Sequence, residues 1–94
     1  MSTMPDYTGW IVRAAAGRDK DGLFCVVGAA QERLLLADGR RRKLARPKAK
    51  DLKHVKLLTD GFGHPAMQKL KQGEALSDNE LRRALAAFRD QLEV

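Results

Sequence analysis

Positive charge is concentrated in one stretch of this 94-residue chain. Residues 40–56 hold nine of the 18 Lys and Arg residues and a single carboxylate, Asp51. This stretch carries a charge of +8 while the whole chain carries +6, so the two flanks together are slightly acidic. Ordinary solvated surfaces mix both signs along their length. Guanidinium and ammonium groups bind phosphate oxygens. We therefore interpret the stretch as a polyanion-binding surface, and a merely solubilising run is the alternative.

Residues that could perform catalysis or hold a metal are scarce. The sequence has no G-x-x-x-x-G-K-[ST] nucleotide loop, and its two serines, Ser2 and Ser77, have no plausible base beside them. The soft metal ligands are Cys25, His54 and His64, which lack the paired spacing of a structural zinc site. We therefore expect a protein that is not an enzyme, with no cofactor, no metal and no small-molecule substrate.

Length and composition restrict the class of protein. Ninety-four residues correspond to one domain with a small core. No apolar run approaches the roughly 20 residues that a membrane-spanning helix needs, and no secretory signal is recognisable at the N-terminus. The single cysteine, Cys25, lies in an apolar run and cannot form an intramolecular disulfide. This favours a reducing compartment, and we expect a cytoplasmic protein without a membrane partner.

Short apolar runs predict the strands that would position the cations. Runs at residues 10–16 and 23–27 flank a polar loop that carries Arg18 and Lys20, and Gly17 and Gly22 allow the chain to reverse there. Further strands are predicted at residues 33–37, 41–45 and 52–58. The first two are separated by the turn at residues 38–39, and Pro47 places the basic strand 41–45 at an edge. Five short strands favour a small closed or nearly closed barrel, so the fold class is mainly β.

The last third of the chain is predicted to be helical. A break rich in glycine and proline begins at residue 61, and residues 66–72 read as a short helix. Ser77 and Glu80 form a capping box, which predicts a helix from residue 78 to about 92. Its apolar stripe consists of Leu81, Ala84, Leu85, Phe88 and Leu92. We expect this stripe to pack on the protein's own barrel or on Phe62, and docking onto another protein is the alternative. The predicted organisation is a flexible lead at 1–8, a barrel at 9–60 and a helical extension at 61–94 packed on the barrel.

The hairpin also carries a family resemblance. Residues 12–27, VRAAAGRDKDGLFCVV, resemble a KOW motif, and residues 35–39 and 56–60 look like its continuation in KOW-type large-subunit ribosomal proteins. The likeness is nearest to the small stand-alone bacterial KOW-domain RNA-binding proteins. One departure is that Asp21 stands where the family usually has glycine after the basic loop residue. The resemblance implies an SH3-like barrel of five strands followed by a C-terminal helix.

The resemblance further implies binding of structured RNA, which would be ribosomal RNA in a ribonucleoprotein or translation role, with ribosome-associated proteins as further partners. None of the aromatic residues lies in the basic stretch, so contacts to RNA backbone and shape are favoured over reading of single bases. Because strand residues alternate in direction, we expect five or six of the nine cations in residues 40–56 to reach phosphates. A protein-interaction adaptor that docks through the C-terminal helix is the alternative function. The predicted RNA-binding residues are Arg13, Arg18, Lys20, Arg40, Arg41, Arg42, Lys43, Arg46, Lys48, Lys50, Lys53 and Lys56.

Overall fold

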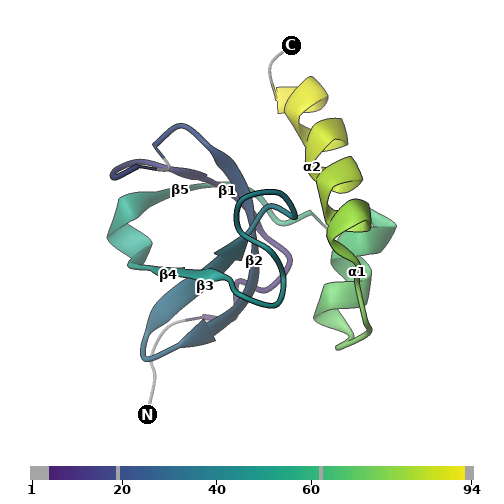
Figure 1. The fold of residues 1–94 in the computed structure, drawn as a ribbon, viewed down its shortest axis with the longest axis horizontal. Coiled ribbons are helices and arrows are strands. Elements are labelled where there is room, and N and C mark those ends of the chain that lie inside the picture. The colour runs from purple at the N-terminus through teal and green to yellow at the C-terminus, as the bar shows by residue number, and fades with distance from the viewer. Residues whose placement is uncertain (1–4, 19, 62, 93–94) are drawn as a thin grey trace.

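A five-stranded antiparallel sheet is the framework of the chain in the computed structural model, which describes residues 5–18, 20–61 and 63–92 (Figure 1). The strands stand in the order β4-β3-β2-β1-β5. Two helices follow the sheet in sequence and lie together on one side of it (Figure 1). The elements are β1 (Ile11–Ala14), β2 (Leu23–Ala30), β3 (Arg33–Ala37), β4 (Lys48–Lys50), the 3-10 turn η1 (Leu52–His54), β5 (Val55–Thr59), α1 (Pro65–Lys71) and α2 (Asp78–Leu92).

The predicted hairpin is confirmed. β1 pairs antiparallel with β2, with Ile11 opposite Cys25 and Arg13 opposite Leu23. The connecting segment, described at residues 15–18 and 20–22, is called the tip loop below. Its left-handed residues are Gly17 and Asp21, with φ of 83° and 69°. Asp21 thus adopts the conformation that we expected of Gly22, because a short polar side chain tolerates the left-handed region better than most.

The second hairpin is tighter than its sequence indicates. β2 continues to Ala30 rather than ending at residue 27, and β3 begins at Arg33 as predicted. Gln31 and Glu32 form the turn between them, both with positive φ (52° and 62°). A two-residue turn of this kind matches the twist of the strands, and it usually contains glycine or asparagine. Neither residue occurs at positions 31–32, so the usual sequence signal of such a turn is missing here.

The predicted fourth strand at residues 41–45 is wrong, and that segment is a loop. Oδ1 of Asp38 accepts hydrogen bonds from the backbone N–H groups of Arg40 (2.8 Å) and Arg42 (2.9 Å). The backbone N–H groups of Asp38 and Gly39 both donate to the carbonyl of Arg42. These local bonds occupy the backbone groups that would otherwise pair with a neighbouring strand. Aspartate side chains often compete with secondary structure in this way. The fourth strand is instead Lys48–Lys50, in the predicted linker, and it starts after Pro47.

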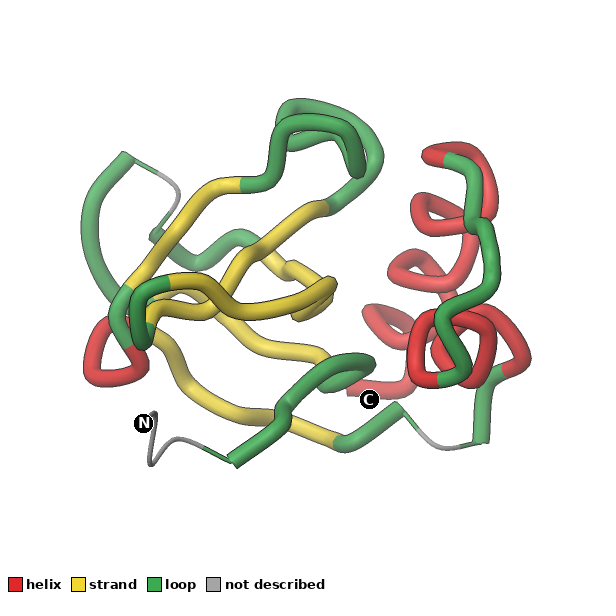
Figure 2. Tube along the Cα trace, turned by 90° about the horizontal axis from the view of Figure 1, so that it is seen from below, coloured by secondary structure: helices red, strands yellow, loops and turns green. Residues whose placement is uncertain are grey.

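The sheet curls but its ladder does not close into a barrel. β4 and β5 are the two edge strands, and no pairing joins them within residues 48–59. Only Asp51 and η1 connect them, and η1 occupies the start of the predicted strand 52–58. So short a connection between opposite edges requires the sheet to bend, as Figure 2 shows. The prediction of a mainly β fold is confirmed, while the closed barrel is not found.

Both faces of the sheet are buried because apolar side chains alternate along the central strand. Leu23 and Cys25 of β2 point to a cluster shared with the helices, whereas Phe24 and Val26 point to a cluster inside the curl. The inner cluster also contains side chains from β1, β3 and β5, and Tyr7 and Trp10 pack against it. Residues 1–4 of the predicted lead lie outside the described part of the chain.

Helix α2 begins and packs as its sequence indicates. Oγ of Ser77 accepts from the backbone N–H of Glu80 (3.1 Å), and the Glu80 carboxylate accepts from the backbone N–H of Ser77 (3.4 Å). The Glu80 carboxylate also forms an ion pair with Lys69 of α1 at 2.8 Å. The hydrogen bond from Lys69, together with that from the Ser77 backbone, lowers the pKa of Glu80 below its ordinary value. Glu80 therefore joins the start of α2 to α1.

The apolar stripe of α2 is buried against the protein's own sheet. Leu81, Ala84, Leu85 and Phe88 belong to the cluster that includes residues of β1, β2 and α1, and Leu92 at the end of the helix is 39% exposed. Phe62, the other packing partner that we considered, lies outside the described residues. None of the helices in the described part is both long and apolar enough to cross a membrane.

Replacing Leu81 by alanine tests this packing. Leu81 is fully buried between α2 and the sheet, so we expect the Leu81→Ala variant to lose about 2–5 kcal/mol in the free energy of unfolding. Arg83→Ala, on the exposed side of the same helix, should change it by less than about 0.5 kcal/mol. Chemical denaturation followed by circular dichroism measures both. Equal stabilities would mean that the stripe contributes nothing to the core.

The thiol of Cys25 should be unreactive until the protein unfolds. Burial raises the pKa of Cys25 from 9.0 to about 12, and its Sγ lies 3.3 Å from the sulfur of Met67. We expect no labelling by a disulfide reagent at pH 8 in native protein and complete labelling in denaturant. The neutral thiol contributes stability below pH 9, and this contribution falls by roughly 1 kcal/mol per pH unit as pH rises toward 12. Fast native labelling at pH 8 would contradict this burial.

Candidate nucleic-acid interface

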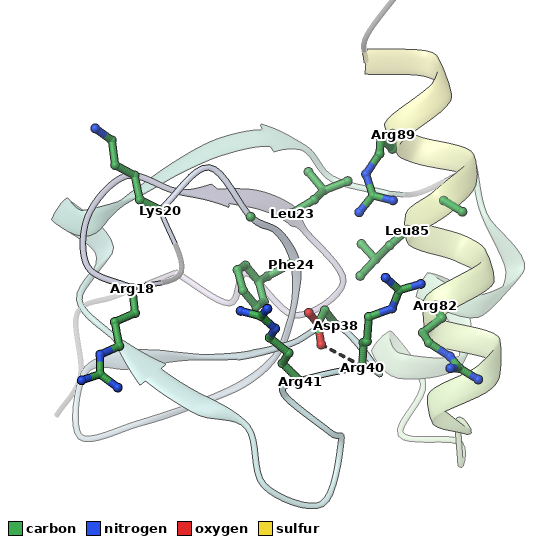
Figure 3. Close-up of a pocket in the computed structure, with 12 residues that line it drawn as sticks. Arg18, Lys20, Leu23, Phe24, Asp38, Arg40, Arg41, Arg82, Leu85 and Arg89 are labelled. Carbon is green, nitrogen blue, oxygen red and sulfur yellow. Dashed lines mark hydrogen bonds between the residues drawn. The ribbon is translucent and has the colours of Figure 1, made fainter.

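A groove with basic walls lies between α2 and two loops of the sheet. Its volume is about 360 Å³, and its floor includes Leu23 and Phe24 of β2 and Leu85 of α2 (Figure 3). The walls are the tip loop, α2 and the loop at residues 38–47 between β3 and β4, which is called the basic loop below. We refer to this hollow as the cationic groove. Three segments that are far apart in the sequence meet there.

Six cations line the cationic groove, and they come in pairs from its three walls. Among the described lining residues, Asp38 is the single carboxylate. Arg82 donates to the neutral side-chain amide of Asn79 at 3.0 Å, so its charge is not neutralised by that bond. The potential of the groove is therefore positive and suits an anionic ligand. The six cations are Arg18 and Lys20 of the tip loop, Arg40 and Arg41 of the basic loop, and Arg82 and Arg89 of α2.

The cationic side chains have two arrangements. In Figure 3, Arg40 and Arg89 extend toward Leu85 from opposite sides of the gap between the sheet and α2. Arg18 and Lys20 instead extend away from that gap, at the outer end of the groove (Figure 3). The groove thus has an inner pair of opposed guanidinium groups and an outer pair that faces solvent.

The basic loop is held against the start of α2 by specific contacts. Oδ1 of Asp78, the first residue of α2, accepts a hydrogen bond from the backbone N–H of Leu44 at 2.8 Å. Gly39 is left-handed (φ 76°), and a Cβ at this position would meet the carbonyl oxygen of Asp78 and lie 3.2 Å from the backbone nitrogen of Arg82. Only glycine combines this conformation with so close an approach. These contacts place Arg40 and Arg41 opposite the arginines of α2.

Two of the predicted cations stabilise the tip loop by donating hydrogen bonds to its backbone carbonyl groups. The guanidinium of Arg13 donates to the carbonyl of Asp21 at 2.9 Å, and the ammonium group of Lys50 donates to the carbonyl of Ala16 at 2.7 Å. Both residues are half-buried. Arg13 and Lys50 therefore position the loop that carries Arg18 and Lys20.

The other predicted cations do not line the groove. Because residues 41–45 form a loop, the alternation that we expected for a strand does not apply to them, although Leu44 does pack inward on the cluster beneath α2. The nine cations of residues 40–56 are thus divided between the groove and more distant elements. These others are Arg42, Lys43 and Arg46 of the basic loop, Lys48 of β4, Lys53 of η1 and Lys56 of β5.

Arg82 and Arg89 were not among the predicted binding residues. They lie in a stretch of mixed charge, which resembles an ordinary solvated helix face. The signal that could have identified them is their spacing of seven residues, two helical turns, beside the buried Leu85. This spacing places both arginines on the border of the apolar stripe, next to the surface on which α2 packs.

Comparisons with known proteins add no identification. No protein-family model matches the sequence, and no curated protein resembles it at a significant level. The resemblance to KOW proteins stays a prediction. Within the described ranges, no three His, Cys, Asp or Glu residues are grouped so that they could hold a metal ion. The interpretation of the site therefore depends on its geometry and charge.

Substitution of Gly39 tests how the basic loop is held on α2. Gly39 and Gly73 are both left-handed (φ 76° and 75°), but nothing lies within 4 Å of a Cβ at Gly73. We expect Gly73→Ala to lose about 1 kcal/mol in the free energy of unfolding through backbone strain alone. Gly39→Ala should lose clearly more, because its methyl group would separate the loop from Asp78. Chemical denaturation measures both values, and equal losses would show that the close approach contributes nothing.

Proposed function

We propose that the protein binds structured RNA through the cationic groove and the cations around it, without catalysing a reaction. The observation that supports this most is the convergence of cations from two separate predicted regions. Arg18 and Lys20 are about twenty residues from Arg40 and Arg41 in the sequence, yet all four line one groove. Phosphate groups are the ligands that such a set of cations suits.

The electrostatic balance of the groove also supports the proposal. Asp38 is the only carboxylate among the lining residues of the described chain, and its Oδ1 is already engaged by two backbone N–H groups. Among the described residues, the ion pairs Arg33–Asp51 and Lys69–Glu80 both involve cations outside the groove. The guanidinium groups therefore remain available for an external anion.

The fold supports a finer structural proposal. We infer an SH3-like arrangement of the KOW type, because β1 pairs with both β2 and β5. The first and last strands in the sequence are therefore neighbours in the strand order β4-β3-β2-β1-β5. The resemblance of the hairpin to a KOW motif then favours ribosomal RNA as the ligand, in a translation-associated role. A cytoplasmic location rests on the single unpaired cysteine, Cys25.

The alternative of an adaptor that docks through its C-terminal helix has less support. Leu81, Ala84, Leu85 and Phe88 are all buried in the protein's own core. A partner could use that face only after α2 had separated from the sheet. The exposed residues of α2 include the arginines Arg82, Arg83 and Arg89, together with the carboxylate of Asp90. This composition suits a polyanion better than an apolar partner surface.

RNA titrations at several salt concentrations test the proposal. If about five phosphates are contacted, a plot of log affinity against log salt concentration should have a slope near −4. Replacing Arg40 and Arg41 by alanine should weaken binding and reduce the magnitude of this slope by about 2, one for each lost phosphate contact. Fluorescence anisotropy with a labelled ribosomal RNA fragment provides both measurements.

The matched control replaces two exposed lysines that do not line the groove. Lys53→Ala with Lys56→Ala removes the same charge from η1 and β5, so we expect a smaller loss of affinity than for the arginine pair. Equal losses would mean that binding is not centred on the groove. An affinity that hardly changes between about 50 and 200 mM salt would contradict RNA binding through phosphates altogether.

A further inference from the structure

The shape of the cationic groove restricts the form of RNA that can enter it. We propose that an unpaired RNA segment, such as a bulge, a loop or an end, passes through the groove between α2 and the basic loop. Its phosphates would lie between Arg40 and Arg89, and a base or ribose would lie against the apolar floor. This inference rests on the proposed function and specifies its substrate.

The size of the groove is the first reason. Its volume of about 360 Å³ is near the lower end of the range for sites that hold one small molecule, roughly 300–1,000 Å³. A single nucleotide is a group of that size. An RNA duplex carries its phosphates on the outside of a wide cylinder, so it can touch the rim of the groove but cannot enter it.

The opposed walls are the second reason. Arg40 belongs to the basic loop and Arg89 to α2, and both extend toward Leu85 (Figure 3). Cations on opposite walls of the groove can contact one phosphodiester strand from both sides. A duplex would contact only one of these walls at a time. Guanidinium planes also stack on unpaired bases, which provides a contact that the buried bases of a duplex cannot make.

The floor is the third reason. Leu23, Phe24 and Leu85 line the groove but are only 5%, 4% and 2% exposed, so its bottom is closed and offers a base a small apolar contact. An unpaired base that enters would therefore be held mainly by the cationic walls. Phe24 exposes too little of its ring to serve as a stacking platform. We therefore expect a preference for unpaired RNA without strong selection of one base.

The outer cations fit the same ligand. Arg18 and Lys20 lie at the end of the groove and extend into solvent (Figure 3). They are placed to contact phosphates of a paired stem on either side of the unpaired segment. The tip loop that carries them is held by the bonds from Arg13 and Lys50. The complete surface therefore suits an unpaired segment next to a helix, which is common in folded RNA.

The experiment compares two RNAs that differ only by a short unpaired insertion. One is a perfect duplex, and the other is the same duplex with a three-nucleotide bulge in one strand. We expect the full-length protein to bind the bulged RNA about tenfold more tightly, because one inserted base adds contacts of the order of a stacked base. Arg89→Ala should weaken binding to the bulged RNA more than binding to the duplex, so that most of the preference is lost.

Arg83→Ala is the matched control, because Arg83 is an exposed arginine of α2 that does not line the groove. It should keep the preference for the bulge. Arg89→Lys retains the charge but loses the planar fork, so it should show an intermediate preference. Circular dichroism of each variant verifies that the fold is intact.

Each remaining outcome separates this inference from the proposed function. Equal, salt-sensitive binding of both RNAs would overturn the unpaired segment and leave RNA binding in place. Absence of salt-sensitive binding to either RNA would overturn both. Adenosine monophosphate is compared with unlabelled bulged RNA as a competitor. If both displace the labelled RNA at the same concentration, the groove is a mononucleotide site, and the inference is overturned.

Discussion

The packing of α2 on the sheet is the interaction on which the rest of this structure depends. It buries Leu81, Leu85 and Phe88 against residues of β1, β2 and α1, and so covers the outer face of a sheet that is already filled on its inner face. A domain of this size has little core to lose, because small chains bury a smaller share of their surface. The same packing turns Arg89 toward the basic loop and forms one wall of the cationic groove. Stability and the candidate interface thus have a common origin.

The basic loop shows how local polar contacts can determine where charge is placed. Asp38 binds the backbone of Arg40 and Arg42, and Asp78 binds the backbone of Leu44. Both carboxylates satisfy backbone groups of a segment that would otherwise be free to pair as a strand. The loop thereby projects Arg40 and Arg41 beside α2, whereas a regular strand would have sent alternate residues to opposite faces. Asp38 and Asp78 thus act in building the loop.

Sequence reasoning succeeded where the signal is local and failed where two local signals compete. The hairpin, the strand Arg33–Ala37 and the helix Asp78–Leu92 follow from apolar periodicity and from the capping box at Ser77. Residues 41–45 were misread because an apolar Leu44 between cations looks like an alternating strand. The backbone N–H of Leu44 donates to Asp78, which is 34 positions away in the sequence. Nothing in the local pattern indicates this contact.

By itself, the amino-acid sequence determined the mainly β class, the capped C-terminal helix and the concentration of cations in residues 40–56, because these depend on composition and on periods of two and 3.6 residues. Only the tertiary structure decided which cations act together. Arg89 faces Arg40 across the groove, whose lining also includes Arg41 and Arg82, while Arg13 and Lys50 hold the tip loop. The physical reason is that convergence of side chains depends on long-range packing of the helix on the sheet, which a linear pattern of charges does not encode.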